Sequence, residues 1–355
     1  MEDLTRVLNA GAEGVVRELI RGSRFSPRSG AFFARFLLSA RSAARKREKL
    51  ERAGEHVPPF LIASITRHCN LRCAGCYDRH RACGHDRSDL SAREWRGIFD
   101  QAREMGVSFI LLAGGEPLLR TDVLEAAAGT GGILFPVFTN GTLLEGAALR
   151  LFDEHRNLVP VLSVEGGAAE TGARRGEGVY ERLLGSMAAL KARGIPFGAS
   201  VTVTRQNLGQ VAAGPFVDDL YERGARAVVY VEYVPVDGND RAAPEEAERR
   251  ALTHALSALR EGRKMLFLSF PGDEAALSGC LAAGRGFFHI ASDGAAEPCP
   301  FSPHSDMTLR DHTLREALAS PLFRRLRDGG VLNLPHAGGC ALFQREELVA
   351  RMARE

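Results

Sequence analysis

The chain has 355 residues, enough for one large domain or two ordinary ones. Its 45% hydrophobic and 25% charged residues are typical of a soluble globular protein, and the formal net charge of +2 argues against bulk nucleic-acid binding. No stretch has the roughly 20 apolar residues of a membrane-spanning helix, and no secretory signal is visible. We therefore expect a cytoplasmic protein, in which the seven cysteines are more readily metal ligands than disulfides.

Residues 1–57 are predicted to form a basic helical arm. They hold 12 Lys and Arg against 7 Asp and Glu, and their apolar side chains recur near helical spacing. A second helix is expected over 31–51, before Pro58 and Pro59 end any helix. Two interpretations are open: a helical pair packed on the core, or an interfacial helix in peripheral contact with an anionic membrane.

From Phe60 onward, apolar runs alternate with helical patterns. Strands are predicted over 60–65, 109–113, 134–139, 158–164, 197–203 and 227–234. Helices are predicted over 91–105, 144–154, 179–193, 210–223 and 245–264. Ser91 and Glu94 have the spacing of a capping box at the start of the first of these helices.

Six strands that alternate with helices indicate a parallel sheet with right-handed crossovers. Because six units are too few for a closed eight-unit barrel, we expect an α/β fold with a partial (β/α)6 TIM-like barrel. Periodicity fades after about residue 272. The predicted organisation is thus an arm at 1–57, a barrel core at 58–271 and a small C-terminal module at 272–355.

Three cysteines lie close together directly after the first predicted strand: Cys69, Cys73 and Cys76, in C-N-L-R-C-A-G-C. Thiolates are the usual ligands of iron–sulfur clusters, so these residues can hold three irons of a 4Fe–4S cube. Without a fourth local cysteine, the fourth iron can stay open to a substrate. A structural zinc loop and a non-catalytic electron-transfer protein are the alternatives, although zinc prefers four protein ligands and ferredoxins space their cysteines differently.

This spacing, followed immediately by Tyr77, resembles the radical S-adenosylmethionine (SAM) superfamily over about residues 58–345. The resemblance implies an oxidoreductase or maturase whose open iron binds SAM. Reductive cleavage would yield a 5′-deoxyadenosyl radical, which abstracts a hydrogen from a peptide, cofactor, carbohydrate or lipid substrate. Reduced flavodoxin or ferredoxin would be the electron donor, and the catalytic residues stay unknown.

Short polar motifs after the later strands fit the same resemblance. Paired glycines in Ala113-Gly114-Gly115-Glu116-Pro117 would let a ligand approach the backbone closely. Glu165 stands where the family commonly has Asp, and Arg175 would pair with the SAM carboxylate through its guanidinium fork. The implied cofactor-binding residues are Tyr77, Gly114, Gly115, Glu116, Pro117, Asn140, Ser163, Glu165, Arg175 and Ser200.

Three late cysteines, Cys280, Cys299 and Cys340, stand in a tail that resembles the SPASM or shorter twitch extension of radical SAM enzymes. The resemblance implies at most one auxiliary 4Fe–4S cluster there. Its fourth ligand could be absent, or could be His304, Asp306, His336 or substrate. The alternative is three buried structural thiols. Cys83 is interpreted as a loop thiol, and the substrate as a small molecule or a peptide.

Overall fold

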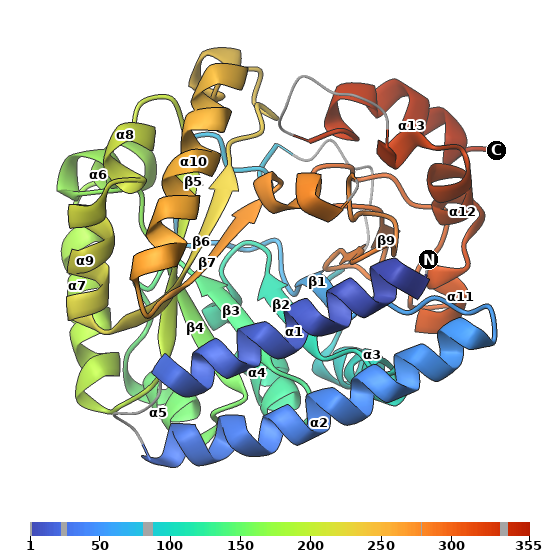
Figure 1. Cartoon of the computed structure of the whole chain (residues 1–355), viewed down its shortest axis with the longest axis horizontal. Helices are drawn as coiled ribbons and strands as arrows, with labels where there is room; N and C mark the ends of the chain where they lie inside the picture. The colour runs from blue at the N-terminus through green and yellow to red at the C-terminus, as the bar shows by residue number, and fades with distance from the viewer. Residues whose placement is uncertain (1, 23–26, 81–87, 278, 334–339) are drawn as a thin grey trace.

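The computed structural model describes residues 2–22, 27–80, 88–277, 279–333 and 340–355. Cys83 and His336, which the sequence raised as candidates, lie outside these residues. Seven strands run parallel in one curved sheet, in the order β7-β6-β5-β4-β3-β2-β1 (Figure 1). They are β1 Phe60–Ser64, β2 Phe109–Ala113, β3 Phe135–Thr139, β4 Leu158–Ser163, β5 Phe197–Val203, β6 Ala225–Glu232 and β7 Leu266–Phe270.

This sheet confirms the predicted partial barrel, with one strand more than the sequence indicated. β7 pairs with β6 from Ala227↔Leu266 to Val231↔Phe270. The sequence predicted a helix up to residue 264, and β7 begins at Leu266. No separate turn signal between the two marked the start of a strand.

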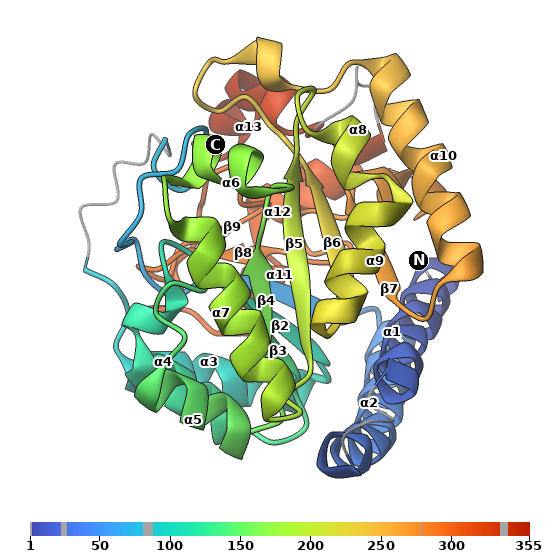
Figure 2. The ribbon, with the colours of Figure 1, turned by 90° about the vertical axis from the view of Figure 1, so that its left-hand side faces the viewer.

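Helices cover the outer face of the sheet (Figure 2). They are α3 Ala92–Met105, α4 Thr121–Ala128, α5 Gly146–Glu154, α6 Ala168–Arg175, α7 Val179–Ala192, α8 Leu208–Val211, α9 Gly214–Arg223 and α10 Glu246–Gly262. The Ser91–Glu94 capping box is present at the start of α3, as predicted. The helix expected over 210–223 is divided into α8 and α9, because Pro215 lies in the first turn of α9, where a missing N–H is tolerated.

The N-terminal arm is a pair of helices, α1 Glu2–Gly22 and α2 Pro27–Arg52, which lie side by side in both views. Phe33 and Phe36 are buried and pack against Leu134 and Val159 of the barrel. Arg47, only 1% exposed, donates hydrogen bonds to Asn9 and Ser108 and to the backbone of Gly106.

This packing favours the first of the two interpretations of the arm. An interfacial helix would turn its phenylalanines toward lipid, but Phe33 and Phe36 pack against the sheet instead. Leu38, at 64%, is a large apolar side chain of this arm that stays exposed. Within the described residues, no helix combines the length and the apolar character that crossing a bilayer requires.

The C-terminal residues extend the same sheet beyond β1. β8 His289–Ile290 pairs in parallel with β1, and β9 Ala296–Glu297 pairs antiparallel with β8. The helices here are α11 Leu314–Leu318, α12 Pro321–Asp328 and α13 Glu346–Met352. Five 3-10 turns complete the described elements: η1 Pro117–Leu119, η2 Asp240–Ala242, η3 Gly272–Leu277, η4 Val331–Asn333 and η5 Phe343–Arg345.

A buried polar chain fastens this region to the barrel. His289 Nε2 lies 2.8 Å from Ser64 Oγ on β1, and His289 Nδ1 lies 2.6 Å from Glu297 Oε2 on β9. Side chains of both parts also belong to one hydrophobic core, among them Leu61, Phe288 and Phe323. The barrel and the C-terminal region therefore share a sheet and a core. The predicted module boundary near residue 272 stays a prediction.

Candidate active site

The early cysteines lie on the loop that follows β1, at the carboxyl ends of the parallel strands, where ligands of such sheets bind. Cys69 is exposed, and Cys73 and Cys76 are half-buried. Gly75 has φ +62°, and a Cβ there would lie 2.4 Å from the Tyr233 ring, so only glycine fits. The loop is also held by a 2.9 Å hydrogen bond from Ala74 N to Arg174 O.

The donors that this loop offers are three thiols, those of Cys69, Cys73 and Cys76. Among the described residues, no three His, Cys, Asp or Glu side chains converge as the ligands of one metal ion would. In a 4Fe–4S cube each cysteine binds a different iron, so its ligands stand farther apart than those of one ion. A donor set made only of cysteine thiols is also the set that iron–sulfur clusters use.

Gly114 and Gly115 accommodate the backbone that leads into the cysteine loop. A Cβ on Gly114 would lie 2.3 Å from Thr66 O, and one on Gly115 would lie 2.1 Å from His68 O. Gly115 N donates to Thr66 O at 2.7 Å, and Glu116 N donates to His68 O at 2.8 Å. That this segment grips SAM stays a prediction, and these two amides are bonded within the chain. They position the loop that carries Cys69.

The Glu116 side chain ties the ends of β2 and β3 together. It is 1% exposed and accepts hydrogen bonds from Thr139 Oγ1 at 2.7 Å, Asn140 N at 2.8 Å and Leu118 N at 3.0 Å. Burial raises the pKa of this carboxyl above its usual range, although the three hydrogen bonds lower it. These contacts hold the motif in place, and a contact of Glu116 with SAM stays a prediction.

Asn140 connects the end of β3 to the cysteine loop. Its Nδ2 donates to Asn70 Oδ1 at 2.9 Å and lies 4.0 Å from Cys69 Sγ. Its Oδ1 accepts from Thr142 N and Thr142 Oγ1 at 2.9 and 2.6 Å. Asn140 is therefore adjacent to Cys69, a predicted cluster ligand, although no sequence signal connected Asn140 with Asn70.

Glu165 and Arg175, each predicted to contact SAM, are paired with one another. Arg175 is the last residue of α6, and its Nε donates to Glu165 Oε1 at 2.9 Å. Arg175 Nη1 lies 3.9 Å from Cys73 Sγ. Burial opposes the charge on Arg175, yet the Glu165 carboxylate outweighs it, and the pKa of Arg175 is raised.

Arg174, which the sequence did not single out, joins this group. Its Nη1 lies 3.2 Å from Glu165 Oε1, and its Nη2 donates to Gly75 O at 3.4 Å. Glu165 Oε2 accepts from Thr202 N on β5 at 3.0 Å. The carboxylate therefore joins α6, β5 and, through the two arginines, the cysteine loop.

Two other predicted residues meet at neighbouring strand ends. Ser163 and Ser200 are register partners on β4 and β5, and their hydroxyl oxygens lie 3.1 Å apart. Tyr77 makes an edge-to-face contact with Phe301, with 5.5 Å between ring centroids. Because Phe301 lies two residues after Cys299, this contact brings the C-terminal module to the cysteine loop.

The late cysteines come together although they are far apart in sequence. Cys280, Cys299 and Cys340 are 6%, 6% and 8% exposed, and the thiols of Cys299 and Cys340 hydrogen-bond each other. Burial raises the pKa of Cys280 well above its ordinary value.

A carboxyl group that the sequence did not indicate joins this set. Glu274, on η3, is 8% exposed and hydrogen-bonds the Cys280 thiol. Burial is the main cause that raises its pKa to about 7. The Gly-, Pro- and Cys-bearing tail gave no signal for a buried glutamate here.

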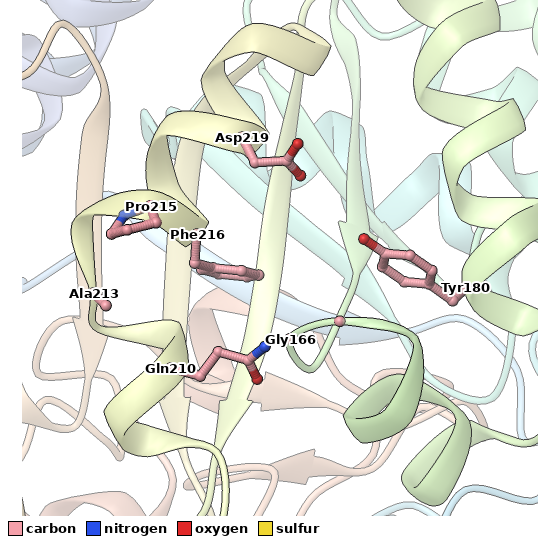
Figure 3. A pocket seen from close by; sticks show the side chains of 8 residues that line it. Gly166, Tyr180, Gln210, Ala213, Pro215, Phe216 and Asp219 are labelled. Carbon is pink, nitrogen blue, oxygen red and sulfur yellow. The ribbon is translucent and has the colours of Figure 1, made fainter.

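A surface pocket of about 380 Å³ lies between α7 and α9, beside Gly166 and Gly167 (Figure 3). Tyr180 and Phe216 face each other across it, with Asp219 at one end. None of the lining residues is a cysteine. The pocket therefore lies beside the site and does not include the proposed cluster ligands.

Comparison with known proteins gives consistent results. Residues 63–212 match the radical SAM superfamily. The AdoMet-dependent heme synthase of Methanosarcina barkeri is 28% identical over 82% of this chain and 90% of its own length. The PqqA peptide cyclase of Ruegeria pomeroyi is 30% identical over 73% of each chain.

Solved structures agree on the fold. Streptococcus suis SuiB bound to S-adenosylmethionine superposes with a TM-score of 0.66, at 20% identity, over 82% of this chain and 72% of its own. Because the family match and the sequence relatives above are of enzymes, the non-catalytic electron carrier is not favoured. With the cysteine loop at the strand ends and these relatives, the chain belongs to the radical SAM superfamily: it is an enzyme that cleaves SAM reductively at a 4Fe–4S cluster and abstracts a hydrogen from its substrate.

Proposed function

We propose that this enzyme oxidises a cofactor precursor of the tetrapyrrole type, with a second iron–sulfur cluster held by the late cysteines. The observation that carries the two-cluster site is the Tyr77–Phe301 contact, which brings the module of Cys280, Cys299 and Cys340 to the loop of Cys69. A substrate bound between the loop and the module would be near both cysteine sets. In this proposal the chain consists of the arm at 1–57, the radical SAM core at 58–271 and the auxiliary-cluster module at 272–355, in that order.

The chain's own residues would hold SAM around the early cysteines. The 4Fe–4S cluster supplies one electron to the SAM sulfonium when bound. Arg175 Nη1 faces the loop at Cys73, where it could also meet a carboxylate, while its Nε stays on Glu165. Ser163 and Ser200 present hydroxyls at adjoining strand ends, and Tyr77 presents an aromatic ring for the adenine.

The remaining predicted SAM residues would act mainly through the loop. Gly114, Gly115, Glu116 and Pro117 fix the backbone before Cys69, and Asn140 lies beside the Cys69 thiol. We propose reduced flavodoxin or ferredoxin as the electron donor, because a cluster on a partly exposed loop is accessible to a protein donor.

Two observations support a tetrapyrrole-type substrate over a peptide. The likeness to the heme synthase covers 90% of that protein. The N-terminal arm uses its apolar face to pack on Leu134 and Val159, so the described arm residues form no separate peptide-binding unit. A peptide substrate is the second candidate, favoured by the 30% identity to a PqqA peptide cyclase.

The test is substrate-dependent SAM cleavage by the anaerobically reconstituted, reduced enzyme. We expect an iron coproporphyrin to increase formation of 5′-deoxyadenosine, and deuterium from a labelled substrate to appear in that product. A panel of precursor peptides serves as the comparison. Stimulation and deuterium transfer with a peptide alone would replace the first candidate by the second.

A further inference from the structure

Four buried side chains from three segments lie near one another in the C-terminal module. Cys280, Cys299 and Cys340 supply three thiols, and Glu274 hydrogen-bonds the first of them from η3. All four are at least nine-tenths buried, with exposures of 6%, 6%, 8% and 8%. The Glu274 carboxyl group therefore adds an oxygen donor beside three buried sulfur donors.

From this geometry we infer that Glu274 is the fourth protein ligand of the auxiliary cluster, giving a set of three cysteines and one glutamate. The inference rests on the proposed second cluster. On binding, each thiol and the carboxyl would release a proton to solvent and bind one iron through sulfur or oxygen, with no change of oxidation state.

The backbone around Glu274 is fixed in the way a ligand requires. Glu274 N donates to Pro271 O at 2.8 Å, and Gly279 N donates to Glu274 O at 3.3 Å, so the backbone of Glu274 is held at both its N–H and its C=O. Cys280 N donates to Leu332 O at 3.0 Å on η4. A Cβ on Gly279 would lie 2.8 Å from Leu332 O, so this close approach requires glycine. The turn and η4 therefore form one anchored unit.

A cation stands near the set. Arg285 Nη1 donates to Cys280 O at 2.9 Å, and its charge acts on Glu274. A ligand set of three thiolates and one carboxylate carries four negative charges, and an adjacent guanidinium reduces the cost of gathering them.

The other described candidates for a fourth ligand, Asp306 and His304, each have a buried atom without a hydrogen-bond partner among the described residues, Asp306 Oδ1 and His304 Nε2. Asp306 Oδ2 accepts from Leu322 N at 2.7 Å, at the start of α12. His304 Nε2 lies 3.9 Å from Glu346 Oε1, and the charges that act on it are those of Glu346, Glu297 and Arg354. Glu274 is the one whose contact with a late cysteine the structure shows.

The experiment uses the full chain with Cys69, Cys73 and Cys76 replaced by Ala, so that only the auxiliary cluster can assemble. Glu274→Gln keeps the size of the side chain, and Glu274→Cys offers a thiolate instead. Asp306→Asn and His304→Gln are the matched controls. Each protein is reconstituted with ⁵⁷Fe, and its iron content, Mössbauer spectrum and electron paramagnetic resonance spectrum are recorded.

We expect the parent to show one iron site that differs from the other three, as an oxygen ligand requires. Glu274→Gln should lose that signature and accumulate a three-iron form, Glu274→Cys should give four similar sites, and both controls should match the parent. Circular dichroism checks that each variant is folded.

Three results would overturn the inference. An unchanged spectrum in Glu274→Gln and Glu274→Cys removes Glu274 from the ligand set. A change confined to Asp306→Asn or His304→Gln assigns the position to that residue. A parent that binds no iron shows that the proposed second cluster itself is absent, and the inference fails with it.

Discussion

The two cysteine sets of this chain differ in assembly and in access. Cys69, Cys73 and Cys76 occupy one loop, in which Cys69 is exposed. Cys280, Cys299 and Cys340 come from three separated segments and are all buried. A partly exposed set can accept a small cosubstrate such as SAM, whereas a buried set suits electron transfer or contact with a substrate already enclosed. The difference separates the cluster that starts the reaction from the one that we propose assists it.

Removing the early set should have the largest effect. Replacing Cys69, Cys73 and Cys76 with Ala should abolish 5′-deoxyadenosine formation, because no other thiols of the described site hold the SAM-binding cluster. Liquid chromatography of the reduced reaction measures this. Iron content should fall to about half, since one of two clusters of equal size is lost. Product formation at the wild-type rate would remove the assigned roles of these cysteines.

Arg175→Ala should affect the early set only. If Arg175 pairs with the SAM carboxylate, loss of that charge-assisted contact costs roughly 1.5–3 kcal/mol, about ten- to a hundredfold in affinity. Calorimetry of SAM binding tests this, with iron content as the control that both clusters are present. Glu165→Gln is the companion variant, because it frees the same guanidinium from its partner. Unchanged affinity in both variants would show that neither contacts SAM.

Alkylation of the cluster-free protein compares the two sets directly. We expect iodoacetamide to modify Cys69 at least about tenfold faster than Cys299, because a buried thiol reacts only after local opening. The hydrogen bond to Cys340, together with burial, raises the pKa of Cys299 and lowers its thiolate fraction further. Peptide mass spectrometry gives the rates, and denatured protein supplies the reference. Equal rates in the native state would contradict the burial difference.

Replacing the late set should change SAM cleavage least. With Cys280, Cys299 and Cys340 changed to Ala, we expect 5′-deoxyadenosine formation without substrate to stay within about twofold, since the early loop keeps its cluster. Iron should fall to about half. A loss of SAM cleavage as complete as in the early triple variant, in protein that still binds SAM, would mean that the two sets act as one unit.

What the sequence alone determined was local. Each feature that was read correctly depends on residues close together in the chain: the C-N-L-R-C-A-G-C motif, the Ser91–Glu94 capping box and the six predicted strands. The structure has the capping box where it was predicted, and each of the six strands within about two residues of its predicted bounds. Short-range patterns of this kind follow from strand and helix geometry, so they are readable without the fold.

Only the tertiary structure decided the partners. It paired Glu165 with Arg175, set the carbonyls of Thr66 and His68 against Gly114 and Gly115, and placed β8 beside β1. It also brought Glu274 to Cys280 and Cys299 to Cys340. Each of these contacts depends on how separate segments pack, and packing is set by the whole hydrophobic core and not by spacing along the chain.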